Sequence, residues 1–178
     1  EQIQATHQEI NYLESVLAQL DVVSQEDIEE VRDELRSQGY LKAQTRKKKG
    51  KKQKKSKPFH FKASDGTDIL VGRNNTQNDE LTGRIANKND WWLHTQNIPG
   101  SHVIVRSANP SDQTLEEAAM LAAYYSKYRD SASVPVDTVQ VKYINKPNGA
   151  KPGFVTYEGQ TTYFVTPSKS KVQELAVK

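Results

Sequence analysis

The sequence predicts an α+β protein, with a mainly antiparallel sheet and packed helices, preceded by a helical hairpin. Apolar residues repeat at helical spacing in residues 1–45, a lysine-rich run fills residues 46–57, and short alternating apolar segments separated by turn residues fill residues 58–178. A segment of about 120 residues is large enough to enclose its own core. We therefore expect the end of a coiled-coil hairpin, a flexible linker and one α+β domain, in that order.

The first 45 residues carry two helical patterns. From Ile3 to Leu20 apolar side chains recur every three or four residues, which is the spacing of a heptad seam. Ser24 and Asp27 have the spacing of a capping box, although Asp replaces the usual Glu, and Gly39 suits the end of the second helix. The helices are predicted to fold back as an antiparallel hairpin. It is either the end of a longer coiled coil, able to self-associate, or a small helical cap on the next domain.

Charge is distributed unevenly along the chain. Residues 1–45 contain ten acidic and three basic side chains, residues 46–57 nine basic and no acidic ones, and residues 58–178 thirteen basic and twelve acidic ones. The basic run has no apolar side chain to bury, which predicts a flexible loop. It either attracts phosphate groups in a salt-dependent manner or serves as a solvated linker. Its candidate phosphate-binding residues are Arg46, Lys47, Lys48, Lys49, Lys51, Lys52, Lys54 and Lys55.

Strands paired in hairpins, interrupted by two helices, are predicted for the rest of the chain. Gly66 in the turn after residue 62 and the Pro-Gly pair before Ser101 are typical of connections between neighbouring strands. Such pairing makes the sheet antiparallel, with helices packed on it. The expected strands are residues 59–62, 68–71, 91–94, 102–106, 134–144, 154–157 and 163–165, and the expected helices are 77–86 and 115–126.

No recognisable catalytic or metal-binding motif is present. His94 and His102 fall on neighbouring predicted strands with Asp79 and Asp90 nearby, but no H-x-x-x-H or C-x-x-C spacing supports a metal centre. Ser101 and His102 are adjacent in a strand and point to opposite faces, so they are a poor nucleophile–base pair. The chain also lacks cysteine, a P-loop and a G-x-G-x-x-G motif. We expect neither an enzyme nor a cofactor.

Side chains suited to RNA recognition are concentrated between Gly72 and Val103. Carboxamides there can donate and accept hydrogen bonds as base edges require, and an arginine can hold a phosphate with two hydrogen bonds. Trp91 and Trp92 face opposite sides of a strand, so one belongs to the core and the other can stack on a base. The alternative is turn chemistry, in which Thr76 or Asn78 caps the next helix. The candidate RNA-contacting residues here are Arg73, Asn74, Asn75, Gln77, Asn78, His94, Ser101 and His102.

The loop at residues 142–153 is a second candidate for RNA contact. It is rich in Pro and Gly and has no apolar residue that suggests a core role, apart from Ile144 and Tyr143 at its start. Its Lys142, Lys146 and Lys151 either contact RNA or keep a hairpin loop soluble.

What the sequence lacks indicates an expected cellular location. No apolar run approaches 18 residues, so no membrane insertion is expected. The first residues have neither the basic nor the apolar region of a signal peptide, which favours the cytoplasm. The chain starts without Met, in the middle of a helical pattern, as a fragment of a longer protein would.

Four blocks of the sequence resemble the NFACT-R domain of the NEMF family. They are G-R-N-N-T-Q-N-D-E-L from residue 72, D-W-W-L-H from residue 90, I-P-G-S-H-V from residue 98 and K-P-N-G-A-K-P-G-F-V from residue 146. The segment E-D-I-E-E-V-R-D-E-L-R-S-Q-G-Y-L-K, from residue 26, is similar to the end of the coiled-coil middle region of the same family. The chain thus resembles the C-terminal part of an RqcH-, FbpA- or PavA-like bacterial protein.

The resemblance implies a role in ribosome-associated quality control. Full-length members bind large ribosomal subunits stalled with peptidyl-tRNA and recruit alanyl-tRNA for alanine tailing, with NFACT-R as an RNA-binding part. The implied partners are therefore large-subunit ribosomal RNA and tRNA. The resemblance also implies an alternative, because related streptococcal proteins are described as fibronectin-binding adhesins involved in virulence. Such atypical adhesins reach the cell surface without a signal peptide.

Overall fold

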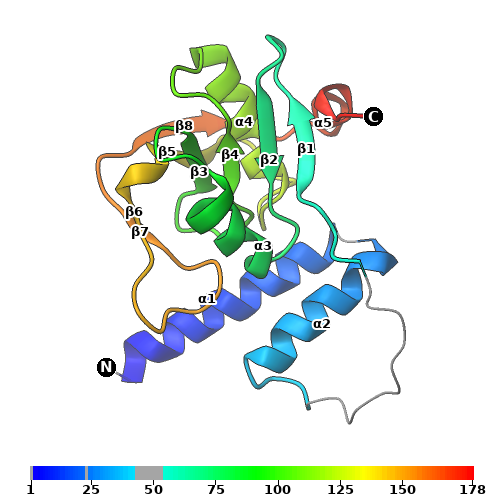
Figure 1. Ribbon diagram of the computed structural model, residues 1–178, viewed down its shortest axis with the longest axis vertical. Coiled ribbons are helices and arrows are strands. Elements are labelled where there is room, and N and C mark those ends of the chain that lie inside the picture. The colour runs from blue at the N-terminus through cyan, green and yellow to red at the C-terminus, as the bar shows by residue number, and fades with distance from the viewer. Residues whose placement is uncertain (1, 23, 43–53) are drawn as a thin grey trace.

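The computed structural model describes residues 2–22, 24–42 and 54–178. It contains a six-stranded sheet with helices packed on it, and a helical hairpin lies along one end of this α+β domain (Figure 1). The predicted α+β class with a preceding helical hairpin is confirmed. Among the described helices, none is both long and apolar enough to cross a membrane.

The main sheet is antiparallel throughout, in the order β1-β2-β4-β3-β5-β8. Apolar residues of β3 and β5 alternate between its two faces, so each face carries its own apolar cluster. A two-stranded sheet of β6 and β7 packs on the face that carries Trp92. The strands are β1 (Phe59–Lys62), β2 (Asp68–Val71), β3 (Trp91–Thr95), β4 (Val103–Val105), β5 (Val134–Gln140), β6 (Ile144–Asn145), β7 (Thr156–Tyr157) and β8 (Thr161–Val165).

The opposite face of the main sheet is covered by α4 (Asp112–Tyr124), whose alanine-rich surface packs closely on the strands. Ser111 caps this helix, because its side chain accepts a hydrogen bond from the backbone N–H of Thr114. The helix α5 (Lys169–Leu175), which the sequence analysis missed, buries Val172 and Leu175 against the same cluster.

The start of α3 (Asn75–Glu80) and the end of β5 differ from their predicted positions for local reasons. The helix α3 begins two residues earlier than expected, because Asn74 caps it by accepting a hydrogen bond from the N–H of Gln77. A π-helical turn (Leu81–Ile85) follows it. The strand expected up to residue 144 ends at Gln140, where a 3-10 turn (Val141–Tyr143) begins.

The predicted helical hairpin is present, but α1 packs through a different face than the heptad spacing indicated. The helices α1 (Gln2–Leu20) and α2 (Ile28–Ser37) meet through Tyr12, Val16 and Val31. Most apolar residues of the predicted seam are exposed, with Ile3 75% and Leu17 63% exposed, whereas Leu13 packs partly against this cluster. Self-association through this stripe stays a prediction.

The ends of α2 were predicted with mixed success. The capping box is wrong, because the Ser24 side chain caps no backbone N–H and a 3-10 turn (Gln25–Asp27) precedes the helix instead. Gly39 ends the helix as expected: its φ of 83° is a left-handed conformation in which glycine carries no steric penalty.

Gly72 permits the tight connection between β2 and α3. Its N–H donates to the carbonyl of His102, 3.1 Å away, and the Oδ1 atom of Asn78 accepts from the His102 N–H, also at 3.1 Å. A Cβ at position 72 would lie 1.9 Å from that Oδ1 atom. The residue must therefore lack a side chain for the start of α3 to lie against β4.

We expect Gly72→Ala to lower the free energy of unfolding by about 2 kcal/mol or more, because the added methyl group displaces Asn78 and breaks its hydrogen bond to His102. Urea unfolding measures the change. The matched control is Gly83→Ala in the π-helical turn, where a Cβ would meet nothing within 4 Å. Equal midpoints for the two variants would show that the close approach at Gly72 is unimportant.

Candidate nucleic-acid interface

The predicted RNA-contacting carboxamides around the start of α3 point into the protein. Asn74, Asn75, Gln77 and Asn78 are 3%, 2%, 7% and 0% exposed, respectively. Each side chain is hydrogen bonded to another protein group. Their role in RNA contact stays a prediction, and in this structure they hold other parts of the chain together.

Two of these connections reach α1 and a third reaches α2. The Nδ2 atom of Asn75 donates to the Ser15 hydroxyl at 2.8 Å, and its Oδ1 atom accepts from Nε2 of Gln19 at 2.9 Å. The buried Glu34 carboxylate of α2 accepts from the backbone N–H of Thr76 at 2.7 Å. The first turn of α3 is thus fixed to both helices of the hairpin.

The same carboxylate also connects α2 to α1. The Tyr12 hydroxyl donates to Oε2 of Glu34 at 2.7 Å. Burial, together with this carboxylate, raises the pKa of Tyr12, so the phenol stays protonated and remains a donor. Glu34 is therefore satisfied by donors from α1 and α3.

Arg73 is likewise engaged with protein groups. Its Nη1 atom lies 2.8 Å from Oδ2 of Asp27, and its guanidinium carbon lies 4.0 Å from the centre of the Phe59 ring. The arginine thus joins the start of α2 to β1. A phosphate would have to compete with Asp27 for the guanidinium group.

The two predicted site histidines do face each other, beside Trp92. The rings of His94 and His102 are perpendicular with centres 5.6 Å apart, and the His94 ring is parallel to that of Trp92 at the same distance. Trp92 is buried as the core member of its pair, whereas Trp91 packs on the α4 side and donates to the carbonyl of Ala108.

His102 is held as a neutral imidazole. Its Nε2 atom lies 2.8 Å from the carbonyl of Gly153 and donates to it, while its Nδ1 atom accepts from the Thr82 hydroxyl at 2.7 Å. Burial, and to a smaller extent the nearby His94, together lower the pKa of His102 to about 3. Burial also lowers the pKa of His94, against the opposing effect of the carbonyls of Thr95 and Gly100.

The acidic residues near the histidines have other partners. Asp79 accepts from the N–H of Gly153 at 2.9 Å and pairs with Lys146 at 3.1 Å, and Asp90 pairs with Arg106 at 3.2 Å. Within residues 2–22, 24–42 and 54–178, no three His, Asp or Glu side chains gather as metal ligands would.

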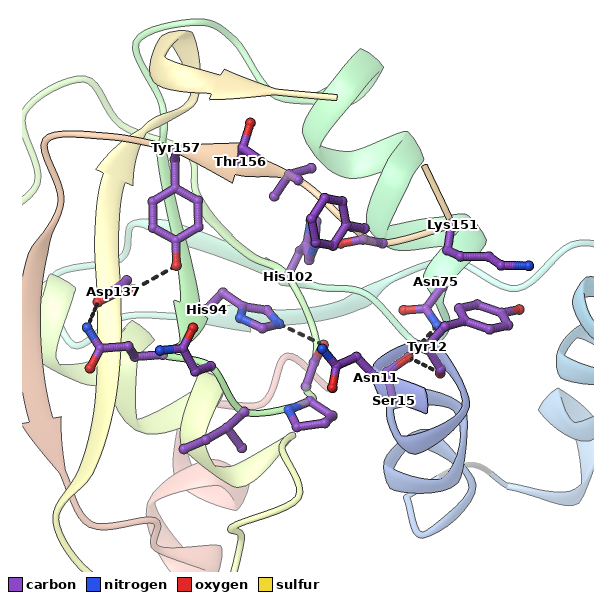
Figure 2. A pocket seen from close by; sticks show the side chains of 18 of the residues that line it. Asn11, Tyr12, Ser15, Asn75, His94, His102, Asp137, Lys151, Thr156 and Tyr157 are labelled. Carbon is purple, nitrogen blue, oxygen red and sulfur yellow. Dashed lines mark hydrogen bonds between the residues drawn. The ribbon is translucent and has the colours of Figure 1, made fainter. Parts of the chain in front are cut away.

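A cleft of about 480 Å³ opens between α1, the sheet face that carries Trp92 and the segment 151–157 (Figure 2). The hairpin contributes Asn11 and Tyr12, and Lys151 lies beside Tyr12, on the side of the cleft away from the sheet. The cleft contains His94 and His102 from the predicted site. The remaining polar lining comes from Gln8, Ser15, Asn75, Gln96, Asn97, Asp137, Thr156, Tyr157 and Gln160.

Most residues of this lining were not predicted from the sequence. Gln8 and Asn11 lie in a helix more than eighty residues from β3, and no local spacing indicates that this helix crosses the sheet. Asn97 is the residue of this lining that the sequence could have indicated, because it lies in the connection beside the I-P-G-S-H-V block. Its φ of 51° is a left-handed conformation that Asn adopts more readily than most residues.

The predicted basic residues fall into three groups: those outside the described residues, those beside a second hollow and those in the loop at residues 142–153. Arg46, Lys47, Lys48, Lys49, Lys51 and Lys52 lie outside the described residues. Lys54 and Lys55 border a second hollow of about 840 Å³, whose other charged lining is acidic and comes from α2 and Glu80. In the predicted loop, Lys142 is exposed, Lys146 is paired with Asp79, and Lys151 lines the cleft. Ser101 is 3% exposed.

The fold and the cleft define an α+β domain of the NFACT RNA-binding type with a helical hairpin docked on it. Residues 57–159 match the family model described as the NFACT protein RNA binding domain, and residues 1–55 match that of the NFACT N-terminal and middle domains. The chain belongs to the NFACT family.

Two proteins named Rqc2 homolog RqcH are similar to nearly the whole chain. The one from Bacillus subtilis (strain 168) is 49% identical over 180 residues, and the one from Streptococcus suis (strain 05ZYH33) 48% over 177 residues. Each match covers 98% of this chain but only 31% and 32% of the respective relative, so the chain spans about a third of their length.

A solved structure has the same fold. It is described as the C-terminal of the fibronectin/fibrinogen-binding protein from Streptococcus suis, and it superposes with a TM-score of 0.91 at 47% identity. The match covers 98% of this chain and 70% of that one.

Glu34→Gln should lower the free energy of unfolding by about 1–3 kcal/mol, because an NH₂ group replaces one of the two oxygens that accept from Tyr12 and Thr76. Chemical unfolding followed by tyrosine and tryptophan fluorescence measures this loss. Asp33→Asn is the control, since that neighbouring side chain is 71% exposed. If both variants unfold alike, the Glu34 contacts do not hold the hairpin in place.

Stability should fall as the pH is lowered from 7 to 5. The folded-state pKa of His102, about 3, is below its ordinary value of 6.5, so the unfolded chain takes up a proton first. The contribution is complete above pH 6.5 and is lost on acidification, by at most about 1.4 kcal/mol per pH unit for one histidine. Urea unfolding across this range should show a smaller slope for His102→Gln. His7→Gln, at an exposed position of α1, should keep the full slope.

Proposed function

We propose that this chain is the RNA-binding module of a ribosome-associated quality-control factor of the RqcH type. The observation that carries the proposal is the match of residues 57–159 to the NFACT RNA binding domain, within a chain similar along nearly its whole length to proteins named Rqc2 homolog RqcH. In this proposal the module binds RNA and catalyses no reaction itself.

The distribution of charge and cavities supports RNA as the ligand. Nine basic side chains are concentrated in residues 46–57, and Lys54 and Lys55, at the described end of this run, are exposed. On the other side of α3 lies the cleft with His94 and Lys151. The run supplies long-range attraction for phosphates, and the cleft supplies ordered polar and aromatic contacts.

The finer proposal concerns a full-length protein of the RqcH type. This chain spans about a third of the length of such relatives. By analogy with the family, it binds the large ribosomal subunit that holds a stalled peptidyl-tRNA, through ribosomal RNA and tRNA. There it recruits alanyl-tRNA, so that alanine tails are added to the nascent chain. In this proposal the protein acts in the cytoplasm, together with the ribosome.

A second candidate function is fibronectin binding at the cell surface. The observation that favours it is the name of the Streptococcus suis protein whose C-terminal structure superposes at a TM-score of 0.91. The lysine-rich run would then act as a polyanion-binding segment, which is chemically compatible with both candidates.

RNA affinity should fall steeply with salt, and the slope of log K against log salt should decrease by about 0.7–0.9 for each phosphate contact removed. Fluorescence anisotropy with labelled tRNA measures both quantities. Lys54→Gln/Lys55→Gln should weaken binding and reduce the slope, and neutralising all of residues 46–57 should do so further. Lys169→Gln/Lys178→Gln is the matched control at two exposed positions near the other end of the domain.

A flat salt dependence, or full affinity after neutralisation of the run, would contradict this assignment. The same preparations are applied to immobilised fibronectin at physiological salt, with and without prior nuclease treatment. Fibronectin binding that survives nuclease treatment, combined with no binding of tRNA, would favour the adhesin function instead.

A further inference from the structure

We propose that the cleft between α1 and the sheet binds a single unstacked nucleotide of the RNA, with the base inside and the phosphate at Lys151. The inference rests on the proposed RNA-binding function and assigns it a specific site. The cleft, at about 480 Å³, lies within the range of about 300–1,000 Å³ that is usual for small-ligand sites. A base that leaves its stack fits such a space, whereas a base-paired helix does not.

Carboxamides that the protein leaves unpaired surround this cleft. Gln8 and Asn11 approach from α1, Asn97 from the end of β3 and Gln160 from the start of β8. All four are exposed, and across the described residues none has a side-chain hydrogen bond to another protein group. They contrast with the buried carboxamides at the start of α3, which are all engaged. Free amide groups that both donate and accept match the edges of nucleobases.

Rings suitable for stacking lie on the same walls. Figure 2 shows His94 and Tyr157 within the cleft, whereas Tyr12, at its α1 side, is 4% exposed and already stacks on Tyr40. Trp92 also lines the cleft, and its buried Nε1 atom has no hydrogen-bond partner among the described residues. Aromatic and imidazole faces are the usual surfaces on which unstacked bases of RNA rest.

The charged side chains of the cleft favour a phosphate beside Lys151 and disfavour one beside Asp137. Lys151 lies with Nζ 5.7 Å from the centre of the Tyr12 ring, at the wall opposite the sheet. The one carboxylate in the lining, Asp137, accepts hydrogen bonds from Tyr157 at 2.6 Å, Thr162 at 2.8 Å and Gln96 at 3.2 Å. These donors offset its charge, so a neutral base can lie beside it.

Nucleotide binding should also fasten the hairpin to the domain. Asn11 and Tyr12 belong to α1, whereas Asn97, Tyr157 and Lys151 belong to the α+β domain, so a bound nucleotide bridges the two parts. A ligand that contacts both parts stabilises their docked arrangement by its binding energy.

The direct test is a titration of the ¹⁵N-labelled chain with AMP, GMP, CMP and UMP, one at a time, with ribose 5-phosphate as the control. At least one nucleotide should shift the side-chain NH₂ signals of Asn11, Asn97 and Gln160, and ribose 5-phosphate should not. No shift with any nucleotide, or equal shifts with ribose 5-phosphate, would overturn the proposal.

A variant test uses single-stranded RNA. Asn11→Ala/Asn97→Gly/Gln160→Ala removes three carboxamides, and glycine preserves the left-handed backbone at position 97. Its affinity should drop about tenfold or more, because the variant loses three hydrogen-bonding groups. The control Gln4→Ala/Gln113→Ala/Gln173→Ala removes three exposed carboxamides that do not line the cleft and should bind normally.

The outcomes separate this inference from the proposed function. If the unmodified chain binds RNA and the cleft variant, shown to be folded by its thermal unfolding, binds it equally well, the nucleotide site is wrong and the RNA-binding function stands. If the unmodified chain binds no RNA, the proposed function fails, and the nucleotide titration still decides whether the cleft takes a base.

Discussion

The arrangement of this molecule depends on the buried polar turn at the start of α3. Asn75 is bonded to Ser15 and Gln19 of α1, and Thr76 to Glu34 of α2. Asn78 is bonded to the backbone of His102 in the sheet domain. Hydrogen bonds have defined directions, so this turn fixes the angle of the hairpin on the domain more closely than apolar contacts would. The cleft exists because that angle places α1 across the edge of the sheet.

Polar groups can be buried where α3 contacts the helical hairpin because nearly all of them are hydrogen bonded. Removing one partner of a buried pair leaves the other unsatisfied at a cost of about 1–3 kcal/mol, so the network stabilises as a unit. Gly153 extends it to the loop at residues 146–153. Its N–H donates to Asp79, its carbonyl accepts from His102, and a Cβ there would lie 2.5 Å from Oδ1 of Asn75. The loop that carries Lys151 is thereby held at the wall of the cleft.

Local patterns predicted the elements better than their assembly. The bounds of β1 and β2 follow directly from alternation and a glycine turn, and the antiparallel sheet follows from hairpin connections. The helix α5 was missed because its short stripe, Val172 and Leu175, lies among lysines. The partners of Asn75 are 56 and 60 residues away in the chain, so no spacing rule could show that its carboxamide is occupied. Composition revealed the chemistry of the 72–103 region, and only tertiary structure shows which groups are free.

The same reasoning changes the meaning of the block G-R-N-N-T-Q-N-D-E-L, which resembles the family so closely. Its carboxamides are those that the protein itself uses, and its arginine is paired with Asp27. The free carboxamides, Asn11, Asn97 and Gln160, lie mainly outside that block and meet only when the hairpin docks. A binding site assembled from two parts of a chain can respond to their relative position, because displacement of α1 removes one wall. The hydrogen bonds between α3 and the hairpin are therefore coupled to the cleft. They fix the position of the hairpin, and that position determines whether a base can be enclosed.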